Sequence, residues 1–352
     1  MKIGTFEVGF GQKPFIIAEM SGNHNRSLDR ALAIVDAAAD AGAQAIKLQT
    51  YTADTMTIDL AEDEFAISDP NSMWAGRTLY DLYDEAHTPW DWHAPIFDRA
   101  KARGMTCFST PFDATSVDFL ESLGAPAYKI ASFENTDVAL IRKAAATGKP
   151  LIISTGMASL TDLDLMVSTA RAAGCRDLAL LKCTSTYPSS PENINLRTIP
   201  HLRDLFGCEV GLSDHTMGVG AAVAAVALGA SVIEKHFTLS RAEGGVDSAF
   251  SLEPTELRML VEETERARLA LGQVRYGPSE AEKGSLQFRR SLYVVEDLAE
   301  GEVFSETNVR AIRPGHGLAP RHLDLVLGCR AARALKRGTP LALDDIFDLR
   351  DA

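Results

Sequence analysis

Eight short apolar runs recur between Phe15 and Glu234, and most are followed by a segment with helical periodicity. Buried parallel strands read as unbroken apolar runs, and βα units alternate such a strand with a crossover helix. Eight units in succession are the pattern of an α/β TIM (β/α)8 barrel, which we therefore expect. The runs are Phe15–Met20, Ala45–Gln49, Met105–Ser109, Ala127–Ile130, Leu151–Ile153, Leu178–Lys182, Glu209–Leu212 and Ser231–Glu234.

Helical patterns separate these runs, for example Leu28–Ala41 and Leu160–Ala173. Several of them end at a glycine, such as Gly42 or Gly174, which helix C-termini favour. A longer segment, Thr50 to Thr88, interrupts the second unit and carries acidic and aromatic residues. Because it exceeds an ordinary barrel loop in length, we interpret it as an active-site loop rather than a separate domain.

Two histidines stand where the seventh and eighth runs end. His215 follows Asp214, and His236 comes two residues after Glu234. In a barrel the C-terminal ends of the strands share one face, where substrates bind. A single histidine there would more often cap a strand or satisfy a core hydrogen bond. Two at equivalent positions beside carboxylates also suit a divalent metal, and both interpretations stay open from these residues alone.

The other residues at the ends of the runs are mostly lysines and hydroxyl side chains. A single lysine at such a place is more often a surface or salt-bridged residue. Three lysines at three strand ends, with Ser or Thr at others, instead favour a site for a phosphate or a carboxylate. Lys47 and Gln49 are two apart, so they face the same side of a strand. The strand-end residues are Glu19, Lys47, Gln49, Ser109, Thr110, Lys129, Ser132, Ser154, Thr155, Lys182, Thr184, His215 and His236.

Charge and cysteine content restrict the partners and the compartment. With 35 Lys and Arg against 48 Asp and Glu, the formal net charge is −13, which argues against nucleic acid as a partner. The five cysteines form no CxxC pair, so we expect reduced thiols in a cytoplasmic protein. The N-terminal residues lack the apolar core of a signal peptide, and no apolar run is long enough to span a bilayer. We therefore expect no association with a membrane.

The pattern changes after the barrel. We divide the chain into a barrel domain at residues 1–272, a linker at 273–288 and a small β-rich domain at 289–352. In the last domain, the segment that starts at Leu298 is echoed by one that starts at Leu335, a weak internal repeat. Between the copies, Arg313 and Pro314 begin a Gly-rich loop. This loop could reach over an anionic ligand or be an ordinary solvated turn.

Ten motifs are spread over nearly the whole chain: IAEMSGNHN (17–25), IKLQTY (46–51), FSTPFD (108–113), YKIASFE (128–134), ISTGM (153–157), KCTSTYP (182–188), GLSDHT (211–216), EKHFT (234–238), FRRSLYV (288–294) and RPGHGLAP (313–320). In combination they resemble the sialic acid synthase, or nonulosonic acid synthase, family. That resemblance implies a TIM barrel followed by a C-terminal SAF (antifreeze-like) domain. The chain departs from the family pattern at Arg26, where glycine is usual. Met20-Ser21-Gly22, TYTADTMTID and SRAEGGVDSAFSLEP are most similar to the pseudaminic branch of the family.

The resemblance implies an enzyme that condenses phosphoenolpyruvate with the open-chain aldehyde of an N-acetylated amino sugar. Carbon 3 of phosphoenolpyruvate attacks the aldehyde, water adds at carbon 2, and phosphate leaves by C–O cleavage to give a 2-keto acid. Similarity to the pseudaminic branch implies 2,4-diacetamido-2,4,6-trideoxyaltrose as the sugar. Synthesis of N-acetylneuraminate or of legionaminate is the alternative.

The resemblance also assigns roles to residues at the strand ends. His215 and His236 would hold a divalent ion, Mn²⁺ first with Mg²⁺ or Co²⁺ as alternatives, which would polarise the aldehyde. Glu19 would transfer a proton, and Asp247 would position a water beside the ion. Lysines and hydroxyls suit the phosphate and carboxylate of phosphoenolpyruvate. These residues would be Lys47, Thr110, Lys129, Ser132, Ser154, Ser185 and Ser213.

Four further residues would contact substrate by the same resemblance: Gln49, Glu134, Tyr187 and Arg313. Arg313 would arrive from the SAF domain of a partner chain, in a domain-swapped homodimer. The linker is compatible with this arrangement, because its Gly, Pro and charged residues predict an extended, solvated segment.

Two other classes of protein remain as alternatives. A desolvated lysine can be a nucleophile, so Lys182 or Lys129 would suit a Schiff-base aldolase that needs no metal. Chelator sensitivity and borohydride trapping separate this alternative from a metal-dependent synthase. A non-catalytic carbohydrate-binding protein is the second alternative, and an absence of phosphate release would support it.

Overall fold

The computed structural model describes residues 1–69 and 72–347. Within them, eight parallel strands close into a barrel in which the last strand pairs with the first, as predicted. Each predicted run overlaps its strand, with ends that differ by at most two residues. In barrel order the strands are β3 (Phe15–Glu19), β4 (Ala45–Thr50), β5 (Thr106–Pro111), β6 (Tyr128–Ile130), β7 (Leu151–Ser154), β8 (Leu178–Cys183), β9 (Glu209–Ser213) and β10 (Val232–His236).

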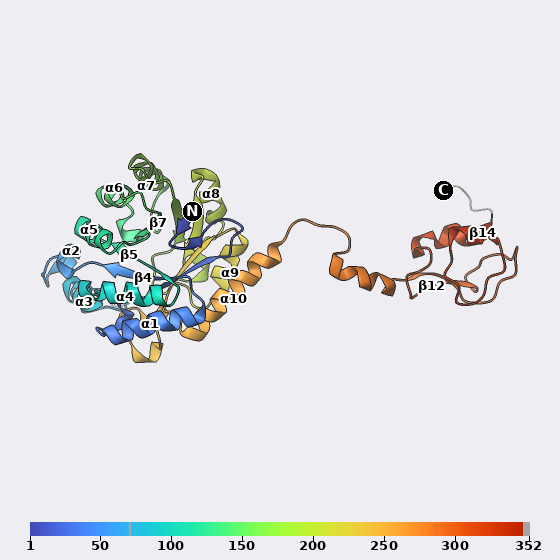
Figure 1. The fold of residues 1–352 in the computed structure, drawn as a ribbon, viewed down its shortest axis with the longest axis horizontal. Helices are drawn as coiled ribbons and strands as arrows, with labels where there is room; N and C mark the ends of the chain where they lie inside the picture. Colours follow the sequence, from blue (N-terminus) through green and yellow to red (C-terminus); the bar gives the residue numbers. More distant parts are fainter. Residues whose placement is uncertain (70–71, 348–352) are drawn as a thin grey trace. The chain divides into compact units, whose positions relative to one another are not determined.

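Helices surround the barrel strands (Figure 1). The sequence supplies their caps: the Ser27 side chain accepts a hydrogen bond from the Arg30 N–H, and Gly42 ends the same helix with φ of 90°. The Asp113 and Asp137 side chains cap two further helices in the same way. The barrel helices are α1 (Leu28–Ala41), α4 (Trp90–Ala102), α5 (Ala114–Ser122), α6 (Val138–Ala145), α7 (Leu160–Ala172), α8 (Thr198–Phe206), α9 (Gly220–Ala227) and α10 (Pro254–Leu271).

The core has two layers because side chains alternate along each strand. On β8, Ala179 and Leu181 belong to the cluster inside the barrel, whereas Leu178 and Leu180 pack against the helices outside. The short N-terminal hairpin of β1 (Lys2–Ile3) and β2 (Phe6–Glu7) adds Ile3 to the inner cluster. The same alternation decides which polar residues at the strand ends face the interior.

The insertion between β4 and α4 contains α2 (Ala53–Met56), a 3₁₀ turn η2 (Asp63–Phe65) and α3 (Leu79–Ala86). Its Trp74 indole N–H donates to the Val246 carbonyl at 3.0 Å. Arg26, the departure from the family pattern, pairs with Asp84 at the end of this insertion. Trp74 thus joins the insertion to the loop that follows β10, and Asp84 joins it to the segment that follows β3.

Among the described residues, 273–347 belong to a second compact unit, distinct from Met1–Gly272. It contains antiparallel pairs of β11 (Ser291–Val294) with β12 (Val309–Ile312) and of β13 (Arg330–Ala331) with β14 (Ile346–Phe347), and a short helix α11 (Leu323–Val326). Leu298 and Leu335, which start the two repeat segments, exchange backbone hydrogen bonds of 2.8 and 2.9 Å. The repeat therefore corresponds to two segments that pair with each other around one small core.

Only part of the segment predicted to be an extended linker is extended. Glu280–Phe288 forms a 3₁₀ helix, η7, which begins after a capping box at Ser279. Most of its residues are exposed, and Val274 and Tyr276 before it are 91% and 92% exposed. The segment is solvated as expected, but the helix makes it shorter than a fully extended chain.

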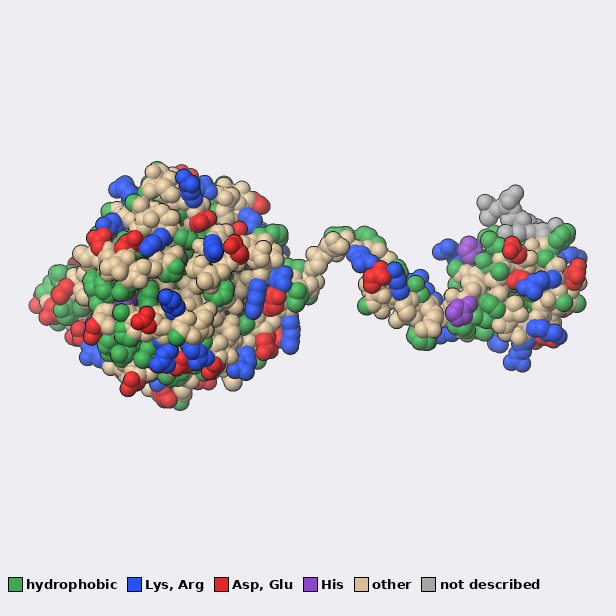
Figure 2. Space-filling model, in the orientation of Figure 1, with side chains coloured by type: hydrophobic (Ala, Val, Ile, Leu, Met, Phe, Trp, Pro, Cys, Tyr) green, Lys and Arg blue, Asp and Glu red, His purple; other side chains and the backbone are tan. Residues whose placement is uncertain are grey.

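Charged side chains of both signs are intermixed on the visible face of the barrel unit (Figure 2), so the net charge of −13 does not gather in one patch there. In the part of the chain that the structure describes, no helix is long and apolar enough to cross a membrane.

Candidate active site

A pocket lies at the C-terminal ends of the barrel strands, and it brings together most of the residues predicted for the site. Strand alternation explains its composition. On β4, Lys47 and Gln49 face inward while Ile46 and Leu48 belong to the outer core. The lining residues are Glu19, Lys47, Gln49, Lys129, Ala131, Ser132, Ser154, Cys183, Tyr187, Ser213, His215, Glu234 and His236.

One half of the pocket is a buried network of two lysines and two carboxylates. Lys47 Nζ lies 2.6 Å from Glu19 Oε2 and 3.9 Å from Glu234 Oε2, and Lys129 Nζ lies 3.7 Å from Glu234 Oε1. All four side chains are at most 7% exposed. Lys47 also donates to Thr110 Oγ1 at 3.0 Å.

Hydroxyl groups extend this network. Lys129 donates to Ser154 Oγ at 2.6 Å, and Ser213 Oγ donates to Glu234 Oε1 at 3.0 Å. Ser132 Oγ accepts from the Gly156 N–H at 3.1 Å. Paired ammonium groups surrounded by hydroxyls suit a ligand with a phosphate and a carboxylate, because each can donate a charge-assisted hydrogen bond.

Burial changes the ionisation of these groups. It raises the pKa of Glu19 to about 7, although Lys47 opposes the shift. It also raises the pKa of Glu134, on the turn η3 (Ser132–Glu134), to about 7. Burial lowers the pKa of Lys129, against the attraction of Glu234. The pocket thus contains one carboxyl group, that of Glu19, which changes charge near neutral pH, where proton transfer is efficient, whereas Glu134 is not among the lining residues.

The two histidines lie at the ends of neighbouring strands, with ring centroids 5.5 Å apart and ring planes tilted by 60°. His215 Nδ1 lies 3.0 Å from the Thr184 carbonyl oxygen and donates to it, and the ring also hydrogen-bonds the Cys183 thiol, so Nε2 could ligate an ion in place of that bond. His236 Nδ1 is buried without a hydrogen-bond partner, and Asp247 Oδ2 lies 3.8 Å from it. Burial also holds the pKa of His236 well below its usual range, so its ring is neutral.

These observations fit a divalent metal held by two imidazoles. Nitrogen ligands lie about 2 Å from such an ion, so rings at this separation can share one. Among residues 1–69 and 72–347, no group of three His, Cys, Asp or Glu side chains is placed to hold a metal. The protein would therefore supply two ligands and leave the other positions for water or substrate.

An aromatic wall covers the histidines. The Tyr187 ring lies 4.4 Å from the His215 ring, and the Phe250 ring lies 4.9 Å from the His236 ring. Trp74, from the insertion, lies 6.2 Å from Tyr187. This side of the pocket is apolar, in contrast to the charged network on the other side.

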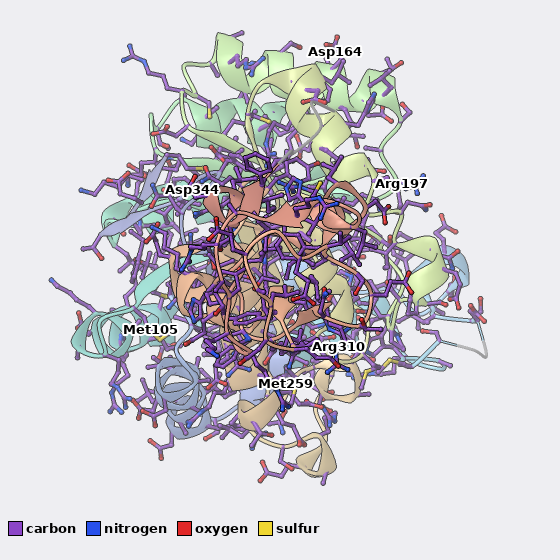
Figure 3. All side chains as sticks on the ribbon, turned by 90° about the vertical axis from the view of Figure 1, so that its right-hand side faces the viewer. Met105, Asp164, Arg197, Met259, Arg310 and Asp344 are labelled. Atoms are coloured by element: carbon purple, nitrogen blue, oxygen red, sulfur yellow. The ribbon has the colours of Figure 1, made fainter. Side chains whose placement is uncertain are left out.

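Some of the residues predicted for the site lie beside the pocket lining. Ser185 Oγ lies 3.9 Å from Cys183 Sγ, and the Asp247 carboxylate accepts a hydrogen bond from Ser21. Arg313 belongs to the second unit, where it is exposed on the loop after β12; Arg310, labelled in Figure 3, lies on that strand.

Lys182 does not fit the Schiff-base alternative. It stands between Leu181 and Cys183, which face the interior, so its own side chain points toward the outer layer of the barrel. Its ammonium group donates to the Cys183 carbonyl at 2.7 Å and to Thr184 Oγ1 at 3.2 Å. The prediction of Lys182 as a possible nucleophile was therefore wrong.

The structure adds Cys183 to the site, and it gives Glu234, which the sequence reasoning named only beside the histidines, two lysine partners. Cys183 lines the pocket, and hydrogen bonding to His215 lowers the pKa of its thiol to about 7 against the effect of burial. Glu234 lies between the two lysines. Both could have been identified from the alternation of side chains along a strand. Cys183 lies two residues after the inward-facing Leu181 on β8, and Glu234 lies two residues before the inward-facing His236 on β10.

Comparison with known proteins agrees with this site. Residues 34–276 match the model of the NeuB family, and residues 289–346 match the SAF domain. The pseudaminic acid synthase of Helicobacter pylori is 44% identical over 337 residues, which cover 95% of this chain and 98% of that protein. The N,N'-diacetyllegionaminic acid synthase of Legionella pneumophila is 36% identical, over 94% of each chain.

A solved structure shows the same likeness. The N-acetylneuraminic acid synthetase of Leptospira borgpetersenii, crystallised with citrate, superposes with a TM-score of 0.72 at 32% identity, covering 82% of this chain and 95% of that one. Proteins of this family condense phosphoenolpyruvate with a sugar, and the lysines, carboxylates and paired histidines at the strand ends of the closed barrel are compatible with that chemistry. The chain belongs to the NeuB family, whose members are generally metal-dependent, with a C-terminal SAF domain.

Proposed function

We propose that this protein condenses phosphoenolpyruvate with 2,4-diacetamido-2,4,6-trideoxyaltrose to give pseudaminic acid and phosphate. The observation that carries the proposal is the convergence of Lys47, Lys129, Glu19 and the two histidines on one pocket. The choice of sugar is supported by the 44% identity to a pseudaminic acid synthase, against 36% to a legionaminic acid synthase.

The charged half of the pocket would bind phosphoenolpyruvate. Glu19 and Glu234 raise the pKa of Lys47 although burial opposes them, so this lysine keeps its charge in a dry site. An arriving phosphate or carboxylate would replace part of the contact between each lysine and its present partners. The residues proposed for this anion site are Lys47, Thr110, Lys129, Ser132, Ser154, Ser185 and Ser213.

The imidazoles of His215 and His236 would hold the metal, for which we propose Mn²⁺, with Mg²⁺ or Co²⁺ as substitutes. When bound, the ion supplies Lewis-acid polarisation of the sugar aldehyde. Asp247, which lies 3.8 Å from His236, would orient a water at this end of the pocket.

The reaction needs a group that accepts a proton and returns it. Carbon 3 of phosphoenolpyruvate bonds to the aldehyde carbon, and the aldehyde oxygen gains a proton. Water adds to carbon 2 and loses one proton. The bond from carbon 2 to the phosphate oxygen then breaks, and the carbon 2 hydroxyl gives its remaining proton to the leaving phosphate, so that the 2-keto group forms. Glu19 suits this transfer because burial raises its pKa to about 7, so that it both accepts and donates near neutral pH.

The sugar would occupy the space between the aromatic wall and the barrel. Gln49, whose amide donates to Glu19 Oε1 at 3.0 Å, faces the pocket beside the proposed base. Tyr187 and Trp74 would contact the deoxy carbon and the acetamido methyl groups, which need apolar neighbours. Glu134 would accept hydrogen bonds from the sugar.

Arg313 would complete the sugar site of a partner chain in a swapped homodimer. With Gly272–Ser279 extended and Glu280–Phe288 helical, the linker spans roughly 45 Å at most. That length and its exposure support a reach to a second barrel. Cys107, Cys175, Cys183 and Cys208 are present as thiols, three of them buried, which supports the cytoplasm as the compartment.

Phosphate release from phosphoenolpyruvate, measured with each candidate sugar in turn, tests the proposal. We expect 2,4-diacetamido-2,4,6-trideoxyaltrose to be used at least about tenfold better, in kcat/KM, than N-acetylmannosamine or the legionaminic precursor, because one lost apolar contact costs about that much. Preference for N-acetylmannosamine or for the legionaminic precursor would instead assign the enzyme to the sialic or the legionaminic branch of the family. Absence of phosphate release with all three would contradict the proposed chemistry.

A further inference from the structure

A buried ion pair lies directly behind the two histidines, on the opposite side of the strand ends from the pocket. Lys235 Nζ lies 2.8 Å from Asp214 Oδ2, and the side chains are 1% and 0% exposed. Asp214 immediately precedes His215 in the chain, and Lys235 immediately precedes His236. Each partner of the pair is therefore covalently next to one of the proposed metal ligands.

Strand alternation separates the pair from the pocket. Glu234 and His236 face the interior, so Lys235 between them points outward, as does its neighbour Ile233 on the other side of Glu234. Neither Asp214 nor Lys235 lines the pocket. The pair consequently has no direct access to substrate.

The pair is part of a closed set of hydrogen bonds that joins the ends of β9 and β10. Asp214 Oδ1 accepts from the Thr216 N–H at 2.9 Å and from the Thr216 hydroxyl at 2.8 Å. Lys235 Nζ donates to the Thr216 carbonyl at 2.6 Å. The Asp214 N–H also donates to the Glu234 carbonyl at 2.9 Å. The turn that carries His215 is thus tied to the strand that carries His236 at several points.

Removing two charges from water is costly, and an apolar pair of similar size would often stabilise the fold as well. A buried ion pair is therefore weak evidence for a role in stability alone. Its directional contacts do, however, fix one strand end against the other, which apolar packing does less strictly. The contacts of this pair hold the backbone segments that carry the two histidines, rather than the imidazole rings themselves.

We propose that Asp214 and Lys235 are positioning residues that set the separation of His215 and His236, so that both can ligate one divalent ion. The inference rests on the proposed metal site. Loss of the pair allows the two strand ends to shift independently, which weakens ion binding even when the fold persists.

The test measures binding of Mn²⁺ alone to the full chain, by electron paramagnetic resonance of the free ion, without substrates. Lys235→Met removes the charge and keeps much of the side-chain volume, and Asp214→Asn keeps an acceptor for Thr216. Asp214→Glu keeps the charge and displaces it by one methylene. We expect each to weaken Mn²⁺ binding by about 10- to 100-fold, with circular dichroism unchanged.

Two controls separate positioning from general destabilisation. Lys143→Met removes the exposed pair with Asp118 at 2.6 Å and should leave Mn²⁺ binding unchanged. Val167→Ala, in the helix layer on α7, lowers stability without touching either histidine and should also bind as the wild type does.

The outcomes also distinguish this inference from the metal site on which it rests. If the wild type binds no Mn²⁺, or binds it equally after His236→Ala, the metal site itself is wrong. If the wild type binds through His236 and every pair variant that folds binds equally well, the positioning role is overturned. If none of the three pair variants folds, the pair is a folding element and the positioning role is likewise rejected.

Discussion

Lys47 Nζ and Glu19 Oε2 lie 2.6 Å apart in a site where both side chains are almost fully buried. Even so, burial raises the pKa of Glu19 to about 7, which means that loss of water outweighs the attraction of the lysine. The same pair thus provides a charged group for an anion and a carboxyl group that exchanges a proton near neutral pH.

The first prediction concerns the pH dependence of catalysis. If Glu19 acts as the base, it must be ionised, so kcat/KM for phosphate release should fall as the pH drops below about 7. Glu19→Gln should lose at least about 100-fold in rate and show no acid limb between pH 6 and 8. Glu19→Asp, which keeps a carboxylate, should retain more activity than Glu19→Gln. An unchanged acid limb in Glu19→Gln would assign the titration to another group.

The second prediction is metal dependence. Removal of divalent ions by a chelator should lower phosphate release by at least about 100-fold, and added Mn²⁺ should restore it. His236→Ala should stay inactive with Mn²⁺ although its circular dichroism matches the wild type. His201→Ala, which changes an exposed histidine on α8, is the matched control and should behave as the wild type. Full activity in the presence of the chelator would show that the reaction does not need a metal ion.

The third prediction concerns the aromatic wall. Trp74→Ala removes the ring that packs 6.2 Å from Tyr187, so the KM for the sugar should rise about tenfold while the KM for phosphoenolpyruvate stays the same. Trp74→Phe keeps a ring but loses the hydrogen bond to Val246, and its KM for the sugar should lie between those of the wild type and Trp74→Ala. Equal effects on both substrates would show that the insertion supports the whole pocket rather than the sugar end.

The fourth prediction concerns stability in acid. Burial lowers the pKa of His93 to about 4, while its ring bonds Thr50 at 2.8 Å and the Pro89 carbonyl at 3.2 Å. Since the unfolded chain binds a proton below pH 6.5 and the folded chain does not, stability falls as the pH drops from about 6.5 to about 4. This histidine alone should cost about 2 kcal/mol between pH 8 and pH 5.

Urea unfolding at the two pH values measures this loss. His93→Gln removes the titrating ring, so its stability should depend less on pH than that of the wild type by about the same amount. Burial also lowers the pKa of His24 to about 4, so His24 should contribute a similar pH-dependent loss of stability. Because His24 is still present in His93→Gln, the variant should keep that part of the pH dependence. An identical pH dependence in His93→Gln would show that His93 does not titrate as described.

The fifth prediction tests the swapped dimer. Arg313→Ala should raise the sugar KM or lower turnover, whereas Arg310→Ala, on β12, should not. Mixing Arg313→Ala with His236→Ala chains should restore activity, because a swapped heterodimer has one site with both defects and one with neither. If the subunits exchange and no activity returns, Arg313 acts within its own chain or not at all.

Local sequence pattern determined much of this protein. The eight apolar runs predicted the barrel because a strand buried on both faces must be apolar throughout, and a helix must follow to reach the next parallel strand. The spacing of Lys47 and Gln49 predicted their common direction, because side chains alternate along a strand with a period of two. The motifs predicted the family and its second domain.

The tertiary structure decided which neighbours those residues have. Lys182 and Cys183 are adjacent in sequence and both follow an apolar run, yet the barrel turns the thiol inward and the ammonium outward, since Leu181 already faces the interior. Trp74 and Tyr187 are far apart in the chain and meet only because the insertion folds over the strand ends. The pKa of Glu19 likewise depends on burial among residues from several strands, and a linear sequence contains no measure of that burial.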